Sequence, residues 1–233
     1  MRQIKLSIII PCFNEAKHIQ NTLEQLQKTR QHGHEVILSD GGSTDNTMLL
    51  SEGLTDHSIC LAHGRAAQMN IASNIATGDI LLFLHADTIT PEDIDTILIS
   101  SLSLSGKKWG RFDVKLSSKK WPFRIIEALM NIRSCISGIA TGDQGIFVYK
   151  HVFDDLAGYS NIPLMEDIEI CKRLRKTSRP LCIKSHKLIT SSRRWEENGI
   201  TSTVLLMWLL RFRYFLGTPA SILAQIYTQK KNT

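Results

Sequence analysis

The stretch 80-ILLFLHADT-88 decides the fold that we expect of this chain. Its first five residues are continuously apolar, which is typical of a strand buried on both faces of a parallel sheet. The run stops at His85, and a carboxylate follows at Asp87. A buried strand has no use for a carboxylate unless something beyond its end needs one. The stretch therefore predicts both a parallel sheet and a ligand at the end of this strand.

Two other apolar runs, residues 6–10 and 35–38, have the same character. Residues 14–29, 47–54 and 65–76 lie between the runs and place apolar side chains at helical spacing. Strands that alternate with helices predict an α/β fold. We expect a Rossmann-like, mostly parallel central sheet flanked by helices.

The second half of the chain is less regular, but it also reads as strands and helices. The alternation in 109-WGRFDVKL-116 is typical of a strand at a sheet edge. The other predicted elements are an amphipathic helix at 121–136, a strand at 145–150, a short charged helix at 166–176 and a last strand at 181–185.

No linker rich in Pro, Gly or Ser divides the chain, so residues 1–233 are predicted to form a single domain. About residues 1–100 should bind a nucleotide, and about 101–200 should complete the site. Residues from about 201 to 233 are predicted to be a helical extension at the C-terminus.

The composition is that of an ordinary soluble globular protein, with 42% hydrophobic and 21% charged residues. The net charge of +6 suits an anionic partner, but it does not choose among nucleic acid, lipid headgroups and a phosphorylated small molecule. The five cysteines are scattered and form no Cys-x-x-Cys pair. They predict reduced thiols in a cytoplasmic protein, and neither a disulfide framework nor a zinc site.

Three carboxylates, Glu15, Asp40 and Asp87, each follow a predicted strand. Ligands of open α/β sheets bind outside the carboxyl ends of the strands. One such carboxylate alone could be a helix cap, but three at the same edge favour ligand binding. Gly41 and Gly42 would let the backbone approach a ligand closely.

The chain contains neither Gly-x-Gly-x-x-Gly nor Gly-Lys-Ser/Thr, so the known glycine-rich phosphate loops are absent from the sequence. A diphosphate would have to be neutralised by a metal or by arginines such as Arg193 and Arg194. Asp87 is a hard oxygen ligand suited to Mg²⁺ or Mn²⁺, with substrate phosphates and water as the remaining ligands. His85 lies two residues earlier and points the same way on an extended chain. It is a poor Mg²⁺ ligand, so we expect it to hydrogen-bond the substrate.

Five motifs in order, SIIIPCFNE, SDGGSTDNT, GRAAQMN, GDILLFLHADT and MEDIEICKRLRK, resemble family 2 glycosyltransferases with the GT-A fold. The resemblance extends over roughly residues 5–195. FLHADT, TGDQGIFV and RRWEENG make it closest to the subgroup associated with arsenosugar biosynthesis or with radical-SAM and selenodomain proteins. It implies an inverting, metal-dependent enzyme that moves a sugar from a nucleotide-sugar donor to a hydroxyl of a small-molecule or lipid-linked acceptor.

The resemblance also implies roles for individual residues. Asp167 matches the catalytic base. Asp87 matches the last acid of the family's Asp-x-Asp metal motif, and His85 stands where the first acid usually is. Asp40 would accept a hydrogen bond from the nucleotide base. The implied nucleotide and donor-binding residues are Pro11, Glu15, Asp40, Gly41, Gly64, Arg65, Asn70, His85, Ala86 and Asp87.

Four residues are expected near the acceptor or the diphosphate: Asp143, Glu166, Arg194 and Trp195. Arg194 and Trp195 resemble the end of the Gln-x-x-Arg-Trp motif of processive synthases. Ser191 replaces the Gln of that motif, which argues against a polymerising role. The implied metal is Mg²⁺ or Mn²⁺, and no nucleic acid is expected as a partner.

Two other hypotheses remain beside the enzyme. A non-catalytic nucleotide-binding module could retain the same fold, although carboxylates at both Asp87 and Asp167 favour catalysis. A nucleotidyltransferase would need a basic, Gly-rich phosphate loop where this chain has PCFNEAKHI.

The C-terminal segment 204-VLLMWLLRFRYFLG-217 is apolar but too short to span a membrane. Its arginines, Arg211 and Arg213, suit peripheral contact at the inner face of a membrane, while packing on the domain or homodimer formation are the alternatives.

Overall fold

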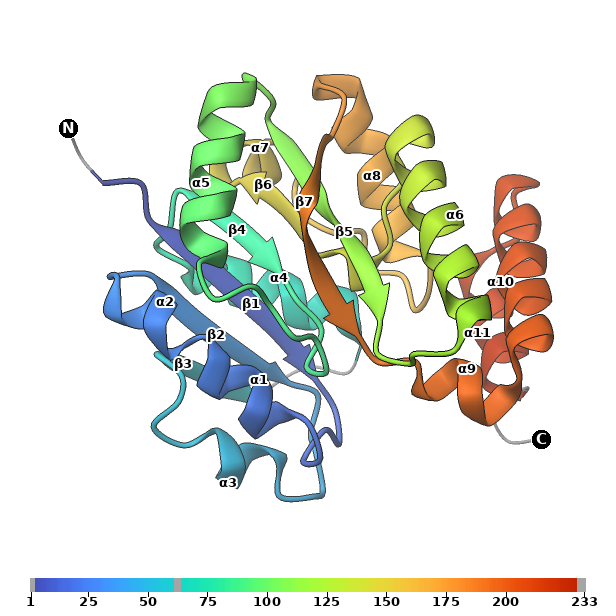
Figure 1. Ribbon diagram of the computed structural model, residues 1–233, viewed down its shortest axis with the longest axis horizontal. Coiled ribbons are helices and arrows are strands. Elements are labelled where there is room, and N and C mark those ends of the chain that lie inside the picture. Colours follow the sequence, from blue (N-terminus) through green and yellow to red (C-terminus); the bar gives the residue numbers. More distant parts are fainter. Residues whose placement is uncertain (1–2, 61–63, 230–233) are drawn as a thin grey trace.

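The computed structural model describes residues 3–60 and 64–229, without the side chain of Arg194. In this part of the chain the strands form one seven-stranded sheet with the order β3-β2-β1-β4-β6-β5-β7 (Figure 1). The strands are β1 Leu6–Cys12, β2 Glu35–Asp40, β3 His57–Cys60, β4 Ile80–Phe83, β5 Trp109–Leu116, β6 Ile146–Tyr149 and β7 Leu181–Thr190.

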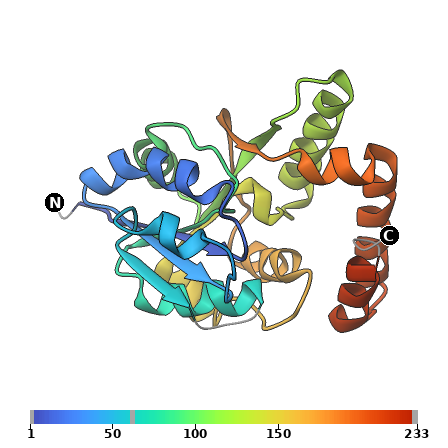
Figure 2. The ribbon, with the colours of Figure 1, turned by 90° about the horizontal axis from the view of Figure 1, so that it is seen from below.

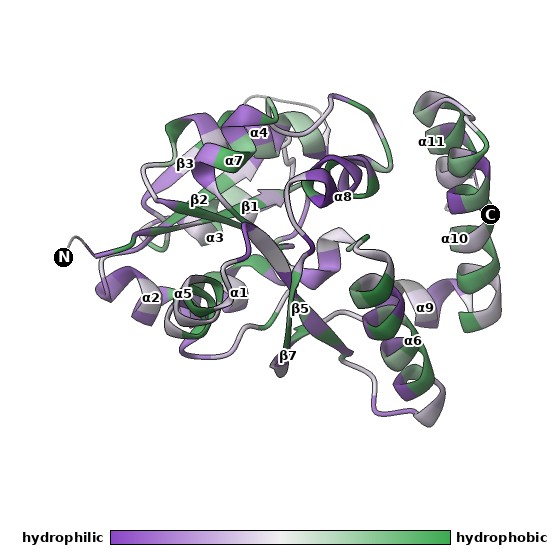
Figure 3. Ribbon diagram, turned by 90° about the horizontal axis from the view of Figure 1, so that it is seen from above, coloured by the Kyte–Doolittle hydropathy of each residue, from purple (hydrophilic) through white to green (hydrophobic). Residues whose placement is uncertain are grey.

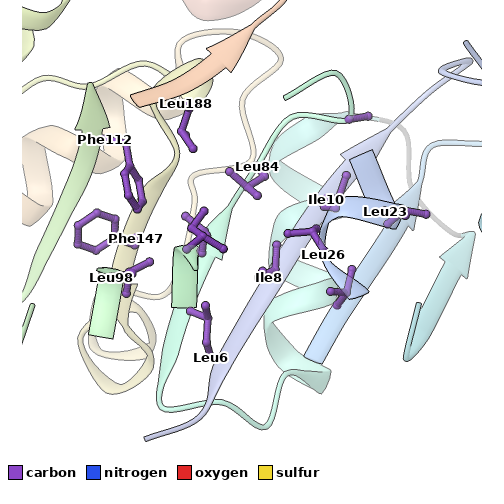
Figure 4. Packing of buried hydrophobic residues seen from close by; sticks show 14 of the residues in the cluster. Leu6, Ile8, Ile10, Leu23, Leu26, Leu84, Leu98, Phe112, Phe147 and Leu188 are labelled. Atoms are coloured by element: carbon purple, nitrogen blue, oxygen red, sulfur yellow. The ribbon is translucent and has the colours of Figure 1, made fainter. Parts of the chain in front are cut away.

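Helices cover both faces of the sheet (Figures 1 and 3). In the cluster drawn in Figure 4, side chains of α1, of α5 and of Leu26 between α1 and α2 pack against one face of the sheet. Side chains of α4, α7 and α8 pack against the other face. The helices are α1 Ile19–Gln25, α2 Gln27–Gln31, α3 Thr47–Ser51, α4 Arg65–Ile75, α5 Ile94–Ser105, α6 Trp121–Ser137, α7 Lys150–Asp155, α8 Glu166–Thr177, α9 Arg193–Asn198, α10 Ile200–Phe215 and α11 Ala220–Gln229, with a 3₁₀ turn η1 Gly142–Gln144.

Strand β6 runs against its two neighbours, whereas the other pairings in the sheet are parallel. Because of this reversal, the residues that precede β6 lie at the edge where the other strands end. The turn η1 therefore meets the carboxyl ends of β1 and β4. This edge carries the candidate site described below.

The predicted α/β fold with a mostly parallel sheet and a C-terminal helical extension is confirmed. The apolar runs form β1, β2 and β4, whose side chains are buried along their whole length. The single helix predicted for residues 14–29 is wrong, because a turn precedes α1 and the chain breaks again at Leu26 before α2. The strand β3 was not predicted, since its side chains are largely exposed and form no apolar run.

The prediction of an edge strand at residues 109–116 is also wrong. β5 lies between β6 and β7, and Trp109, Arg111 and Phe112 are fully buried. Arg111 is neutralised by an ion pair with Asp113 and donates to the backbone oxygen of Asn131 at 2.7 Å. A buried arginine paired inside the protein thus gives an internal strand the same polar–apolar alternation in sequence as an edge strand.

The prediction that all five cysteines are reduced thiols is wrong for one pair. Cys135 of α6 and Cys182 of β7 form a disulfide, with their Cα atoms 6.0 Å apart. The two residues are 47 positions apart in the sequence, and only the packing of α6 beside β5 and β7 brings them together. The thiols of Cys12, Cys60 and Cys171 are free.

A buried carboxylate joins three segments at the opposite edge of the sheet. Glu35 at the start of β2 accepts hydrogen bonds from Ser7 Oγ, from Thr77 N at 2.6 Å and from Gly78 N at 3.1 Å. Burial alone would raise the pKa of Glu35, but the hydrogen bonds from Ser7 and Thr77 outweigh it and lower the pKa. The ionised form is therefore the one that holds β1, β2 and the turn before β4 together.

Glu35→Gln should lower the free energy of unfolding at neutral pH by about 1–3 kcal/mol, because charged hydrogen bonds are lost. Since the folded-state pKa of Glu35 is depressed, its contribution is present above the ordinary glutamate pKa and is lost as the pH falls below it. Urea unfolding between about pH 7 and pH 3.5 should show a smaller decline in stability for the variant than for the wild type. Parallel pH profiles would contradict the assignment.

Candidate active site

A small cavity of about 10 Å³ lies where β1 and β4 end, with room for roughly one water molecule. Its walls come from the strand ends, from α4, from η1 and from the first residues of α8. Five residues predicted from the sequence line it together, namely Pro11, Arg65, His85, Glu166 and Asp167. The structure thus brings predicted donor-side and catalytic residues to one place.

Two adjacent carboxylates open α8. Met165, the residue before them, has a left-handed backbone with φ of 70°, which is uncommon for a side chain of this kind. The turn directs Asp167 towards η1, where its Oδ2 accepts from Gly142 N at 3.1 Å, and its Oδ1 accepts from Ile168 N at 2.7 Å. Glu166 is buried, with Oε1 3.6 Å from Arg65 Nη1.

Burial raises the pKa of Asp167, against the opposing hydrogen bonds from Ile168 and Gly142. Burial and the neighbouring charge of Asp167 raise the pKa of Glu166, and Arg65 acts in the opposite direction. A carboxylate with a raised pKa is a better proton acceptor near neutral pH than an ordinary one. The α8 pair therefore has the electrostatics of a general base.

His85 follows β4 and lies directly against η1. A Cβ added to Gly142 would stand 2.5 Å from His85 Nε2, so a side chain at that position would have to displace the imidazole. Ala86 is buried, and its backbone oxygen accepts from Thr22 Oγ1 of α1 at 2.8 Å. The chain beyond β4 is thus fixed at two successive residues just before Asp87.

Glu15 and Asp87 form a second acidic pair at the ends of β1 and β4. Burial raises the pKa of Glu15, the nearby charge of Asp87 raises it further, and Arg193 opposes both. Glu15 Oε1 lies 4.0 Å from Arg193 Nη2, while its buried Oε2 has no hydrogen-bond partner among the described residues. An unpartnered carboxylate oxygen beside a second carboxylate fits a divalent cation bound by oxygen ligands.

Within residues 3–60 and 64–229, no group of three or more His, Cys, Asp and Glu side chains could hold a metal by itself. A cation at Asp87 would therefore need oxygen ligands from a substrate and from water. His85 lies at the inner cavity, where a hydrogen bond to substrate remains the prediction.

Two predicted donor residues already have hydrogen-bond partners within the protein. The carboxylate of Asp40 accepts from Gly42 N at 2.9 Å and from Ser43 N at 2.8 Å. Burial would raise the pKa of Asp40, but the hydrogen bonds from Ser43 and Gly42 lower it. Asn70 exchanges two hydrogen bonds of 2.8 Å with the backbone of Tyr159. A contact of Asp40 or Asn70 with a donor remains a prediction.

Gly41 has a packing reason for lacking a side chain. Gln68 of α4, a residue that the sequence did not single out, donates to Cys12 O at 2.8 Å and to Ser39 O at 3.0 Å. A Cβ on Gly41 would lie 2.9 Å from Gln68 Nε2. Gln68 thus ties the ends of β1 and β2 together, and close packing explains the glycine without a ligand.

The remaining predicted residues surround the site less closely. Gly64 directly precedes α4 and has a φ of 100°. Asp143 lies in η1 and accepts from Thr141 Oγ1, next to the cavity-lining Gly142. Trp195 lies in α9 and is partly buried. The side chain of Arg194 is outside the described structure, so its predicted role stays untested.

Known proteins resemble this chain in sequence and in fold. A family model described as "Glycosyl transferase family 2" matches residues 7–121. The glycosyltransferase GlyG of Streptococcus pneumoniae is 26% identical over 96 residues, which cover 38% of this chain and 32% of GlyG. The chain therefore spans only about a third of the length of this curated relative.

Two solved structures share the fold. Staphylococcus aureus TarS 1–349 in complex with UDP has a TM-score of 0.67 at 15% identity, covering 81% of this chain and 60% of TarS 1–349. Glucosyl-3-phosphoglycerate synthase of Mycobacterium tuberculosis, in complex with Mn²⁺, UDP and glucosyl-3-phosphoglycerate, has a TM-score of 0.62 at 16% identity, covering 88% and 79%. At these identities the likeness concerns the fold alone.

Proposed function

The chain belongs to glycosyltransferase family 2 and has the GT-A fold, and on that premise we propose that it transfers a sugar from a nucleotide-sugar donor to an acceptor hydroxyl. The observation that carries the proposal is the convergence of His85 and the α8 carboxylate pair on one cavity at the carboxyl edge of the sheet. The transfer we propose is inverting and metal-dependent. We place its donor side at Glu15 and Asp87.

The chemistry follows from the position of Asp167. The acceptor oxygen bonds to the anomeric carbon while the bond from that carbon to the diphosphate breaks, and Asp167 takes the hydroxyl proton. Mg²⁺ or Mn²⁺ held by Asp87, with Glu15 nearby, would supply positive charge to the leaving diphosphate. Arg193, and Arg194 beside it in the sequence, would add to that charge. Glu166, paired with Arg65, would support the loop that presents Asp167.

Within the family, we propose the subgroup associated with arsenosugar biosynthesis or with radical-SAM and selenodomain proteins. The support is in the sequence, through FLHADT, TGDQGIFV and RRWEENG. Ser191 stands where processive synthases have the Gln of their Gln-x-x-Arg-Trp motif, which supports a single transfer to a small or lipid-linked acceptor. A non-catalytic nucleotide-binding module is the alternative.

A thermal-shift screen of nucleoside diphosphates and their sugars, each with Mg²⁺, with Mn²⁺ and with chelator, tests the donor proposal. Ligand present at about 100 times its Kd should add about 2.7 kcal/mol of stability. We expect one nucleotide series to raise the Tm in a metal-dependent manner. Release of the nucleoside diphosphate from that donor by the enzyme would then exclude the non-catalytic module, and no shift with any nucleotide would overturn the proposal.

The C-terminal extension gives the proposed cytoplasmic protein a candidate membrane contact. Figures 1 and 2 place α10 and α11 at the end of the molecule farthest from α1–α3. Among the described residues no helix has the length and hydropathy to cross a membrane. Five large apolar side chains of α10 are nevertheless exposed, namely Leu205, Trp208, Leu209, Phe212 and Phe215.

If α10 lies on a membrane surface, Trp208→Ser together with Phe212→Ser should strongly reduce co-sedimentation with vesicles that contain anionic lipid, because the inserted apolar area is lost. Sedimentation of the wild type should also weaken as salt is raised. Arg179→Gln, an exposed arginine outside the extension, serves as the control. Absence of sedimentation at low salt, combined with a dimer in size-exclusion chromatography, would favour the homodimer instead.

A further inference from the structure

Two arginines approach the candidate base from helices outside the sheet. Arg211 of α10 follows Leu210, which is fully buried in one cluster with Met165 and Ile168, the residues on either side of the α8 carboxylate pair. Arg133 of α6 donates from Nη1 to Ile139 O at 3.2 Å, just before η1. The charge of Arg211 lowers the pKa of Asp167, and the charge of Asp167 raises the pKa of Arg133. The two helices thus deliver positive charge to the same carboxylate.

Arg133 is not satisfied by the protein around it. Its Nη2 is buried and has no hydrogen-bond partner among the described residues. Burial and the nearby charge of Arg211 lower the pKa of Arg133 to about 10, against the opposing charges of Asp143 and Asp167. An unsatisfied buried donor and a like-charged neighbour are both unfavourable. An anion bound between the two guanidinium groups would relieve both.

The nearby carboxylates are occupied elsewhere. Asp143 accepts from Thr141 Oγ1, and the two oxygens of Asp167 accept from Gly142 N and Ile168 N. Within the described part of the chain neither Arg133 nor Arg211 forms an ion pair within 4.0 Å. Asp143 and Asp167 therefore offset part of the positive charge of Arg133 and Arg211 but do not accept their N–H hydrogen bonds.

Resting on the proposed function, we infer that Arg133 and Arg211 bind a phosphate monoester on the acceptor, next to the hydroxyl that Asp167 deprotonates. The donor-side carboxylates lie at the ends of β1 and β4, whereas α6 and α10 lie on the other side of the start of α8 (Figures 1 and 3). An anion held there belongs with the acceptor and not with the nucleotide. A phosphate monoester carries close to two negative charges near neutral pH, and it matches two guanidinium forks.

The arginines exchange no atoms in the reaction. The acceptor oxygen gains its bond to the anomeric carbon, the diphosphate leaves with the electron pair of the broken bond, and the hydroxyl proton passes to Asp167. Neutralisation of Asp167 by that proton removes one negative charge from beside the arginines. Their hold on the acceptor phosphate then strengthens as the reaction proceeds, which is the direction that favours catalysis.

Calorimetry tests the inference with inorganic phosphate and sn-glycerol 3-phosphate as probes and glycerol as the uncharged control. The nucleoside diphosphate found in the donor screen is kept at saturation, so that phosphate cannot bind at the donor position. We expect binding of both phosphates and not of glycerol. Arg133→Gln and Arg211→Gln should each weaken binding about tenfold or more, because a hydrogen bond to a charged group is lost.

Arg179→Gln should leave the phosphate affinity unchanged, since that arginine is exposed and lies outside α6 and α10. Arg133→Lys keeps the charge without the fork and should retain part of the affinity, which guards against a Gln variant that fails to fold. Circular dichroism and nucleotide binding report whether each variant is folded and whether the donor site works.

Vesicles of phosphatidylcholine with and without phosphatidic acid distinguish the two sources of such a phosphate. Arginine-dependent binding of the soluble probes alone indicates a phosphorylated small molecule as acceptor, and arginine-dependent binding of phosphatidic acid alone indicates a lipid phosphate. The inference would be overturned if no phosphate bound, or if phosphate binding survived both Gln substitutions. In either case, nucleotide binding by the same protein would leave the proposed function intact. If no nucleotide binds, the proposed function itself fails.

Discussion

Asp167→Asn should lower kcat by about 10²- to 10⁴-fold, the range that a general base contributes. The asparagine keeps the size of the side chain but cannot take the acceptor proton. Donor affinity should change by less than about tenfold, because the base acts on the acceptor. Steady-state kinetics gives kcat, and calorimetry with the donor and metal gives the affinity separately.

Glu166→Gln is the matched control, since the two carboxylates are adjacent in α8. It should have the milder effect if Glu166 supports the loop through Arg65, whose Nη1 lies 3.6 Å away. Loss of turnover in Glu166→Gln with activity preserved in Asp167→Asn would reverse the two roles. Full activity in both variants would refute the proposed mechanism.

Asp87→Ala should weaken metal-dependent donor binding by at least the roughly 10- to 100-fold that even outer-shell partners of a metal contribute. The residue lies beyond the end of β4 and is partly exposed, so its loss should leave the Tm of the free protein nearly unchanged. Calorimetric titration of the donor, with Mn²⁺ and with chelator, measures the metal-dependent part. The wild type should lose affinity in chelator, and the variant should not.

His85→Asp complements that experiment, because it restores the acid that the family usually has at this position. We expect tighter metal binding from the added carboxylate. Asp155→Ala, an exposed carboxylate in α7, is the control for a general effect of charge. A metal dependence that is the same in Asp87→Ala and in the wild type would show that the metal lies elsewhere.

Much of the fold follows from the sequence for a simple physical reason. Strands buried on both faces are largely apolar, so the sequence shows β1, β2 and β4 as nearly continuous apolar runs. The carboxylates after these strands were also legible, because parallel strands end at one edge. Asp87 and Glu15 could therefore be assigned to the same edge from the sequence alone, and in the structure the charge of Asp87 does raise the pKa of Glu15.

The other side of the site could not be read in this way. Gly142 reaches the same edge by preceding a strand, because β6 is reversed. Arg133 and Arg211 lie on helices with exposed apolar residues, and the sequence suggested lipid headgroups as the partner of Arg211. Only the tertiary packing that places Leu210 in one cluster with Met165 and Ile168 brings α10 to the start of α8, where the charge of Arg211 acts on Asp167. The direction of a side chain on a helix depends on what the helix packs against, which the local sequence does not contain.

The order of strands has a consequence for folding. Residues 6–83 supply the adjacent strands β3, β2, β1 and β4, and residues 109–190 supply the other three. Among the strands that the structure describes, the two groups pair where β4 meets β6 over four residues. Asp87 follows the first group, and Asp167 belongs to the second. The carboxylate proposed for the metal and the one proposed for the proton thus become neighbours only when this long-range seam has closed, a step that local contacts cannot complete. Turnover would then require the finished tertiary assembly.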